Sequence, residues 1–168
     1  MTPREIAHER LAVVDEAKTW IGTPFHYEAR VKGAGVDCGE LLLMVYEACG
    51  VFARPSREVM GRFRPLWFMN KNDEPYLKLM NMLGVEVEPP PLRKPLPGDA
   101  LIWYYGLAYS HGGIVVDWPN VLHTFTNSPC MIEDALRAAS LNNADDPRKI
   151  RRALRHPMKV FVPKRWMA

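Results

Sequence analysis

The stretch GAGVDCGELLLMVYEACG, residues Gly33–Gly50, decides the expected fold. Its second half, Leu41–Ala48, is apolar on nearly every side, which predicts a buried helix closed by the final glycine. Asp37 is a favourable N-cap residue and Glu40 follows three positions later, so the pair predicts a capping box. Cys38 therefore lies in the first turn of a helix whose other side chains mostly form core.

A thiol at this position has two physical advantages as a nucleophile. The N-terminus of a helix carries partial positive charge, which predicts a lowered pKa for Cys38. The free N–H groups of the first turn can also stabilise the negative oxygen of a tetrahedral intermediate. Cysteines are nevertheless common in protein cores, so position alone leaves a catalytic and a core role open for Cys38. Cys49 and Cys130 are predicted to be core residues.

Two histidines in the second half of the chain are candidate partners for this thiol. His111 lies in YSHGGIVV and His123 lies in NVLHTF. Both runs predict strands, and the DWPN sequence between them predicts a hairpin turn. The histidines lie at similar distances from that turn, so strands about 4.8 Å apart would bring the imidazoles together. Cys38, His111 and His123 thus form a candidate nucleophile, general base and orienting residue.

Helical patterns precede strand patterns along the chain. The opening MTPRE predicts a capped helix that ends at Gly22, and Tyr76–Leu83 predicts a further short helix. The proline-rich segment Val87–Asp99 suits neither a helix interior nor a central strand, so we expect an extended crossing between two halves. Strands are expected over Ala100–Tyr105, Ser110–Trp118, Asn120–Phe125, Cys130–Asp134 and Met158–Trp166, with a helix over Ala135–Leu141. This order predicts an α+β protein with a mostly antiparallel sheet.

The composition narrows the class of protein. A chain of 168 residues, 48% apolar and 24% charged, is typical of a single globular domain, here residues 1–168. The net charge of +3 is modest, and we expect the basic run Asp146–His156 to be a solvated helix face with no nucleic-acid partner. Three cysteines without metal-type spacing predict neither zinc nor a disulfide framework. The polar start and the absence of a long apolar run predict synthesis in a cytoplasm without a signal peptide or a membrane span.

Taken in order, these motifs resemble those of the NlpC-type cell-wall cysteine peptidases, a branch of the papain-like fold. The matching segments are IGTPF (Ile21–Phe25), GVDCGELLL (Gly35–Leu43), LPGDALIW (Leu96–Trp103), SHGGIVV (Ser110–Val116) and VLHTF (Val121–Phe125). No single motif is decisive, but the ordered set is specific. The resemblance implies a papain-like α+β fold in which N-terminal helices pack on an antiparallel sheet, with no metal or organic cofactor.

The resemblance also implies roles for residues. Cys38 would be the nucleophile, His111 the base and His123 the orienting third member. Four further residues are expected to support the site or its oxyanion: Asp37, Gly39, Tyr27 and Ser110. The implied activity is hydrolysis of an amide or isopeptide bond in peptidoglycan stem peptides. The sequence is most similar to the versions in phage tails and gene-transfer agents, so the expected partners are tail-tip or hub proteins of such a particle.

Two departures from the family pattern keep other functions open. Glu40 places a carboxylate near the thiol, which would raise the thiol pKa. Phe25 stands where the family often has a tyrosine whose hydroxyl assists the oxyanion, and Tyr27 is a candidate replacement. These departures leave a structural tail-tip subunit with little or no catalysis as an alternative. A thiol acyltransferase or amidase acting on another substrate is a third possibility, because a fold does not fix a substrate.

Overall fold

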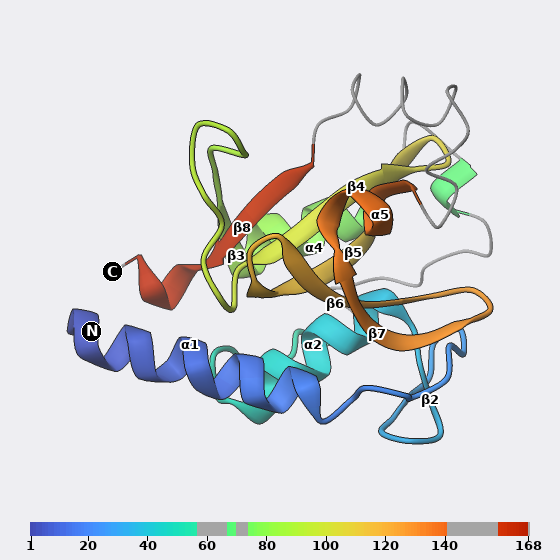
Figure 1. Ribbon diagram of the computed structural model, residues 1–168, viewed down its shortest axis with the longest axis horizontal. Coiled ribbons are helices and arrows are strands. Elements are labelled where there is room, and N and C mark those ends of the chain that lie inside the picture. The colour runs from blue at the N-terminus through green and yellow to red at the C-terminus, as the bar shows by residue number, and fades with distance from the viewer. Residues whose placement is uncertain (57–66, 70–73, 141–157, 168) are drawn as a thin grey trace.

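The computed structural model describes residues 1–56, 67–69, 74–140 and 158–167. In chain order the elements are α1 (Pro3–Lys18), β1 (Arg30–Val31), β2 (Gly35–Val36), α2 (Cys38–Ala48), η1 (Trp67–Met69), α4 (Pro75–Leu83), β3 (Gly84–Val87), β4 (Ala100–Tyr105), β5 (Ala108–Asp117), β6 (Asn120–Phe125), β7 (Ser128–Asp134), α5 (Ala135–Ser140), β8 (Lys159–Pro163) and η2 (Lys164–Trp166). Helices α1 and α2 lie side by side below the main sheet in Figure 1, and both chain ends lie at its left. The basic run Asp146–His156 falls outside the described residues.

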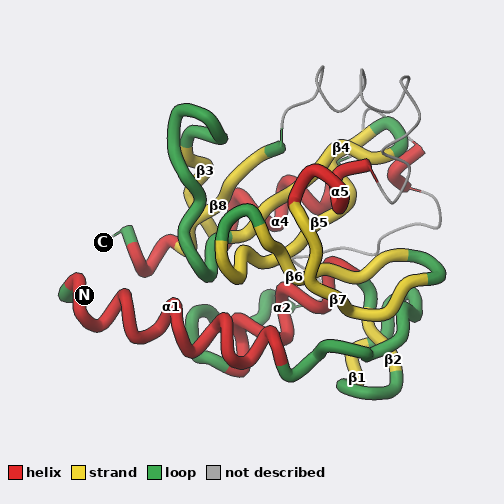
Figure 2. The backbone as a smooth tube through the Cα atoms, in the orientation of Figure 1, coloured by secondary structure: helices red, strands yellow, loops and turns green. Residues whose placement is uncertain are grey.

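The main sheet has six strands in the order β3-β8-β4-β5-β6-β7, and every neighbouring pair is antiparallel (Figure 2). Strands β4 and β6 have the predicted bounds, and β5 and β6 form the predicted hairpin. Other elements differ from the prediction: β5 spans Ala108–Asp117 and β7 spans Ser128–Asp134, so each begins two residues earlier than expected. The edge strand β3 follows α4 directly, and the final strand stops at Pro163, where a 3₁₀ turn takes over to Trp166.

The two faces of the sheet carry different apolar clusters because side chains alternate along each strand. One face packs against α1, α2 and α4, and its buried strand residues include Ile102, Ile114 and Leu122. The other face packs against α5 and includes Leu101, Trp103, Val115 and Val121. His111 lies opposite Trp103 in the ladder between β4 and β5, so its side chain belongs to the face that α5 covers.

Helix α1 begins as predicted and ends earlier. Thr2 is its N-cap, and the complete capping box with Glu5 is present. The helix stops at Lys18 rather than at Gly22, because the next three N–H groups bond to carbonyls three residues back. The shortened turns bury Trp20 and leave Ile21 53% exposed. The predicted end of the helix is therefore wrong.

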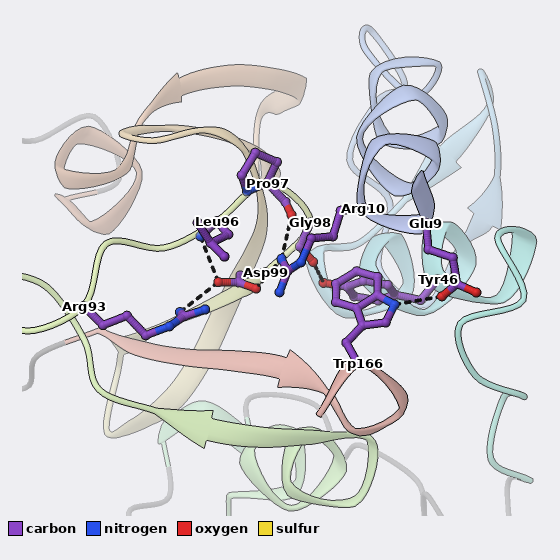
Figure 3. A network of polar contacts seen from close by, with 9 residues as sticks. All are labelled: Glu9, Arg10, Tyr46, Arg93, Leu96, Pro97, Gly98, Asp99 and Trp166. Atoms are coloured by element: carbon purple, nitrogen blue, oxygen red, sulfur yellow. Dashed lines mark hydrogen bonds and ion pairs between the residues drawn. The ribbon is translucent and has the colours of Figure 1, made fainter. Parts of the chain in front are cut away.

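The segment that crosses from β3 to β4 is fixed by a buried carboxylate (Figure 3). Asp99 is fully buried and accepts hydrogen bonds from Arg10 at 2.7 Å, from Arg93 at 2.9 Å and from the Leu96 N–H at 2.9 Å. The hydroxyl of Tyr46 donates to the carbonyl of Gly98, the residue before Asp99, at 2.8 Å. Side chains from α1 and α2 thereby hold the proline-rich segment against the start of β4.

Candidate active site

The start of helix α2 places the thiol. Cys38 is its first residue, and Asp37 is its N-cap. One carboxylate oxygen of Asp37 accepts from the Glu40 N–H at 2.8 Å, and the other accepts from the Glu28 N–H at 2.8 Å. The Glu40 carboxylate pairs instead with Arg54, so only the Asp37 half of the predicted capping box forms. The negative charge of Glu40 is thereby paired with the guanidinium of Arg54.

The thiol of Cys38 lies against strand β5. Its Sγ is 3.8 Å from the carbonyl oxygen of Ser110, whose own hydroxyl donates to the Tyr105 carbonyl at 2.9 Å. Burial and the charge of Asp37 raise the thiol pKa to about 12. The backbone N–H groups of Gly112, Gly39 and Cys38 lower the pKa, but their effect is smaller.

The predicted direction of the Cys38 pKa shift is therefore wrong. The helix N-terminus does favour the thiolate, but desolvation in this partly buried position is the larger effect. The neighbouring charge that raises the pKa is that of Asp37, and not that of Glu40 as the sequence suggested. The thiol is protonated at neutral pH, and a nucleophilic role requires a nearby base.

The two histidines lie together as the hairpin predicts. Gly113 of β5 pairs with His123 of β6, which places His111 and His123 on the same face of the sheet. The Nε2 atom of His111 is 3.0 Å from Nδ1 of His123. Both side chains are buried, and burial lowers the pKa of each ring, so both are neutral at pH 7.

A carboxylate that the sequence analysis missed extends this pair. Oε1 of Glu133, on β7, is 2.7 Å from Nε2 of His123, and the two side chains are 8% and 2% exposed. Glu133 pairs with Val121 in the ladder, so it is a diagonal neighbour of His123 on the same face. The two residues lie three and six positions from the turn at Thr126 and Asn127, so counting outward from that turn does not pair them.

One nitrogen of His111 remains available. Its Nδ1 is buried and has no hydrogen-bond partner among the residues that the structure describes. This is the ring nitrogen nearer to the backbone of His111. The Sγ of Cys38 lies against the same stretch of backbone, between the Ser110 carbonyl and the Gly112 N–H. Within the described part of the chain, no hydrogen bond joins this sulfur to the ring. Helix α2 packs on one face of the sheet and the His111 ring belongs to the other, so the structure brings the thiol to the strand of His111 and not into contact with its ring nitrogen.

Aromatic side chains enclose the His111 ring. Trp103 stacks on it with ring centroids 5.3 Å apart and an interplanar angle of 27°. Phe125 packs edge-on at 5.3 Å, and His123 does so at 5.1 Å. This packing fixes the ring and keeps water away from it, which explains the low pKa of His111.

Tyr76, at the start of α4, is a second residue that the sequence analysis missed. Its side chain is buried, and its hydroxyl donates to the Cys38 carbonyl at 3.5 Å. A Cβ atom on Gly112 would lie 2.1 Å from that hydroxyl oxygen, and one on Gly39 would lie 3.5 Å from the ring. The hydroxyl therefore fills the space between α2 and β5 beside the thiol. No local pattern in the sequence connects residue 76 with this position.

Tyr27 lies in the loop before the active-site helix and is 50% exposed. It lines a surface pocket of about 450 Å³ whose other lining residues are Pro24, Phe25, His26, Thr126, Asn127 and Pro129. Phe25 forms a backbone bridge with Val36, the residue before the N-cap Asp37, so the pocket lies beside the helix start. The expected oxyanion role of Tyr27 stays a prediction.

In the described part of the chain, no three His, Cys, Asp or Glu side chains gather in a way that could hold a metal ion. None of the described helices has both the length and the apolar character needed to cross a bilayer.

Solved structures with a similar fold carry NlpC names. The NlpC/p60 domain of the peptidoglycan hydrolase SagA has 20% identity and a TM-score of 0.50, over 77% of this chain and 92% of that one. NlpC1 from Trichomonas vaginalis has 15% identity and a TM-score of 0.59, over 92% of this chain and 44% of that one. NlpC2 from the same organism has 16% identity and a TM-score of 0.55, over 92% and 46%. The chain thus spans less than half the length of either T. vaginalis protein.

The similarity to these structures establishes the fold. The chain has an α+β, papain-like fold of the NlpC/p60 type, with N-terminal helices packed on an antiparallel sheet, and this confirms the predicted class. The sequence itself matches no protein-family model and no curated protein. Sequence identities of 15–20% support a shared fold and not a shared function.

Proposed function

We propose that the protein is a cysteine peptidase that hydrolyses amide bonds in peptidoglycan stem peptides. Cys38 is the nucleophile, His111 the general base and His123 the residue that orients the base. One observation carries this proposal: the thiol lies against the backbone of a buried histidine whose ring is held by a second histidine and has one nitrogen without a partner among the described residues. A base needs such a free nitrogen, and a merely structural histidine is normally satisfied.

The protonation states favour a neutral resting pair. The pKa of the Cys38 thiol is raised and that of the His111 ring is lowered, so neither group is charged before substrate binds. The reaction requires Nδ1 of His111 to come within hydrogen-bond reach of Sγ, which it does not contact in this structure. The thiol proton then passes to Nδ1 as Sγ approaches the carbonyl carbon of the substrate. A carbon–sulfur bond forms, and the electron pair of the carbonyl moves to its oxygen.

The remaining steps follow from the same groups. The N–H groups of Cys38 and Gly39 lie at the start of α2, where partial positive charge stabilises the oxyanion. When the intermediate collapses, the carbon–nitrogen bond breaks and the amine leaves with the proton from His111. Water then attacks the thioester with His111 again as the base, which releases the carboxylic acid and restores the thiol.

Two arguments support peptidoglycan as the substrate class. The ordered motifs of the sequence resemble cell-wall peptidases, and one structure of the same fold is named a peptidoglycan hydrolase. The surface pocket lined by Tyr27 lies beside the segment that leads into α2, and neither Cys38 nor His111 lines it.

Cleavage of purified stem peptides tests the proposal. We expect wild-type protein to release amine and acid fragments, and Cys38→Ala to release none above background. Cys49→Ala is the matched control, because Cys49 is also partly buried but lies at the other end of α2. Equal turnover by the wild type and Cys38→Ala would contradict the assignment of the nucleophile.

The setting of this activity is a separate proposal, supported by the motif resemblance alone. We propose that the protein acts in a phage tail or a related particle, in contact with tail-tip or hub proteins. Glu40, one reason to consider a purely structural tail subunit, is paired with Arg54. Particles carrying Cys38→Ala should assemble normally and lose infectivity, whereas unchanged infectivity would favour the structural role.

A further inference from the structure

We infer that Glu133 is a positioning residue that fixes the tautomers of both histidines and thereby makes Nδ1 of His111 the base. The inference rests on the proposed function for its catalytic consequence. Its structural basis is the continuous chain from Oε1 of Glu133 through both rings of His123 and His111, with contacts of 2.7 and 3.0 Å.

The tautomers follow from the end of this chain. An ionised carboxylate only accepts hydrogen bonds, so Nε2 of His123 must carry a proton to donate to Glu133. In a neutral ring the other nitrogen, Nδ1, is then an acceptor. Nε2 of His111 faces that acceptor and must carry the proton of its own ring. Nδ1 of His111 is left with a free lone pair, and this is the buried nitrogen that has no partner in the described residues.

One alternative distribution of protons has to be considered. His123 could be a cation that donates from both nitrogens, which would leave the proton of His111 on Nδ1 and abolish its role as a base. Burial opposes this arrangement, because it lowers the pKa of His123 despite the opposing effect of Glu133. The neutral arrangement is therefore the resting state at pH 7.

Glu133 also has a role once the reaction has begun. When Nδ1 of His111 takes the thiol proton, that ring becomes a buried cation, and His123 is its hydrogen-bond partner. The negative charge of Glu133 lies one ring away, in a region with little water to screen it. The carboxylate thus stabilises the protonated base without contacting the substrate.

A purely structural ion pair makes a different prediction. If Glu133 only held β6 to β7, its removal would lower stability and leave the proton positions in His111 unchanged. The two roles are separated by reading the tautomers directly, which requires no enzymatic activity.

The experiment uses full-length protein labelled with ¹⁵N-histidine at pH 7. Two-bond ¹H–¹⁵N correlation spectra distinguish a protonated from a bare ring nitrogen, and His111→Gln and His123→Gln assign the signals. We expect both rings to carry their proton on Nε2 in the wild type. In Glu133→Ala we expect a substantial fraction of His111 with its proton on Nδ1.

Kinetics on stem peptides provide the second readout. Glu133→Ala should lower kcat by about 10²-fold or more with KM nearly unchanged, because the fraction of enzyme with a competent base falls. Glu133→Gln keeps an oxygen that can accept from His123, so it should retain the tautomers and lose only about tenfold in kcat. Glu86→Gln, in an exposed pair with Lys159, is the matched control and should behave as the wild type.

A wild-type spectrum with His111 protonated on Nδ1 would overturn the inference. Wild-type tautomers and kcat in folded Glu133→Ala would do the same. Expected tautomers in a protein that cleaves no stem peptide would support the assignment and refute the proposed function instead. Failure of the role inferred for Glu133 can therefore be distinguished from failure of the proposed peptidase function.

Discussion

Two buried polar clusters lie in this molecule, one around Asp99 and one around His111. The carboxylate of Asp99 is fully buried, and both of its oxygens accept hydrogen bonds, from two arginines and a backbone N–H (Figure 3). The His111 cluster is equally buried, but it ends in a ring nitrogen that has no partner in the described chain. Among the described residues, the first cluster satisfies its buried polar atoms, whereas the second leaves both Nδ1 of His111 and the indole Nε1 of the stacked Trp103 without a partner.

The difference indicates what each cluster is for. A buried polar atom without a partner costs about 1–3 kcal/mol, so a fold gains nothing in stability by keeping one. Asp99 ties α1 and the proline-rich segment to the sheet, and its full pairing suits that structural role. The free nitrogen of His111 suits proton transfer, because a lone pair already used in a hydrogen bond is a poor base.

The largest expected effect separates the clusters by activity. His111→Gln should lower kcat by about 10²–10⁴-fold, the usual contribution of a general base. The free energy of unfolding should change by less than about 1 kcal/mol, because the substitution also removes an unsatisfied nitrogen. Steady-state kinetics and urea denaturation measure the two quantities. A loss of less than tenfold in kcat would remove His111 from the role of base.

The opposite result is expected for the paired cluster. Asp99→Ala leaves Arg10 and Arg93 without their shared carboxylate, and it should lower the free energy of unfolding by about 3 kcal/mol. The kcat of the folded fraction should stay within about twofold of the wild type. Urea denaturation and active-site titration check this. A variant that keeps its stability and loses its activity would show that the comparison assigns the wrong roles.

The packing beside the thiol gives a smaller effect. Gly112→Ala places a Cβ 2.1 Å from the Tyr76 hydroxyl, so it should lower the free energy of unfolding by about 1–3 kcal/mol. Tyr76→Phe removes the clashing oxygen, and the double variant should recover part of the loss. Equal losses in the single variant and the double variant, measured by denaturation, would mean that the hydroxyl does not fill this space.

The smallest effect concerns pH. The pKa of Asp37 is raised by burial to about 6, so the folded state binds more protons than the unfolded state between about pH 4 and pH 6. The contribution of Asp37 to the free energy of unfolding is therefore lost as pH rises through this window, by about 1–2 kcal/mol.

Asp37→Asn keeps a good N-cap residue and should lack this part of the pH dependence. Its thiol pKa should also fall, by up to about one unit, because the charge of Asp37 raises it in the wild type. Denaturation at pH 4.5 and pH 7, and alkylation of Cys38 as a function of pH, measure the two effects. Identical pH profiles for the variant and the wild type would contradict both.

Local sequence signals predicted the elements that carry the site. The N-cap at Asp37, the helix from Cys38 and the hairpin that joins His111 to His123 depend on residues close in the chain, and the structure has all three. The end of α1 was predicted at Gly22, although the helix gives way after Lys18 to tighter turns around Trp20. The choice between a helical turn and a 3₁₀-type turn depends on tertiary packing, which the local pattern does not contain.

Long-range packing determined what the sequence did not predict. The position of Glu133 beside His123 depends on the register of β6 and β7, and that of Tyr76 depends on how α4 packs over β5. The pKa of Cys38 also depends on long-range packing. The helix start was visible in the sequence, but the burial that reverses the shift comes from strands more than seventy residues away.

The most direct test of the account is to capture the acyl-enzyme. Wild-type protein is mixed with stem peptide, quenched in acid within milliseconds to seconds and analysed by intact mass and peptide mapping. The account predicts that the protein gains the mass of the acyl fragment and that the adduct lies on Cys38. Peptide cleavage with no adduct on Cys38, and with Cys38→Ala equally active, would contradict it.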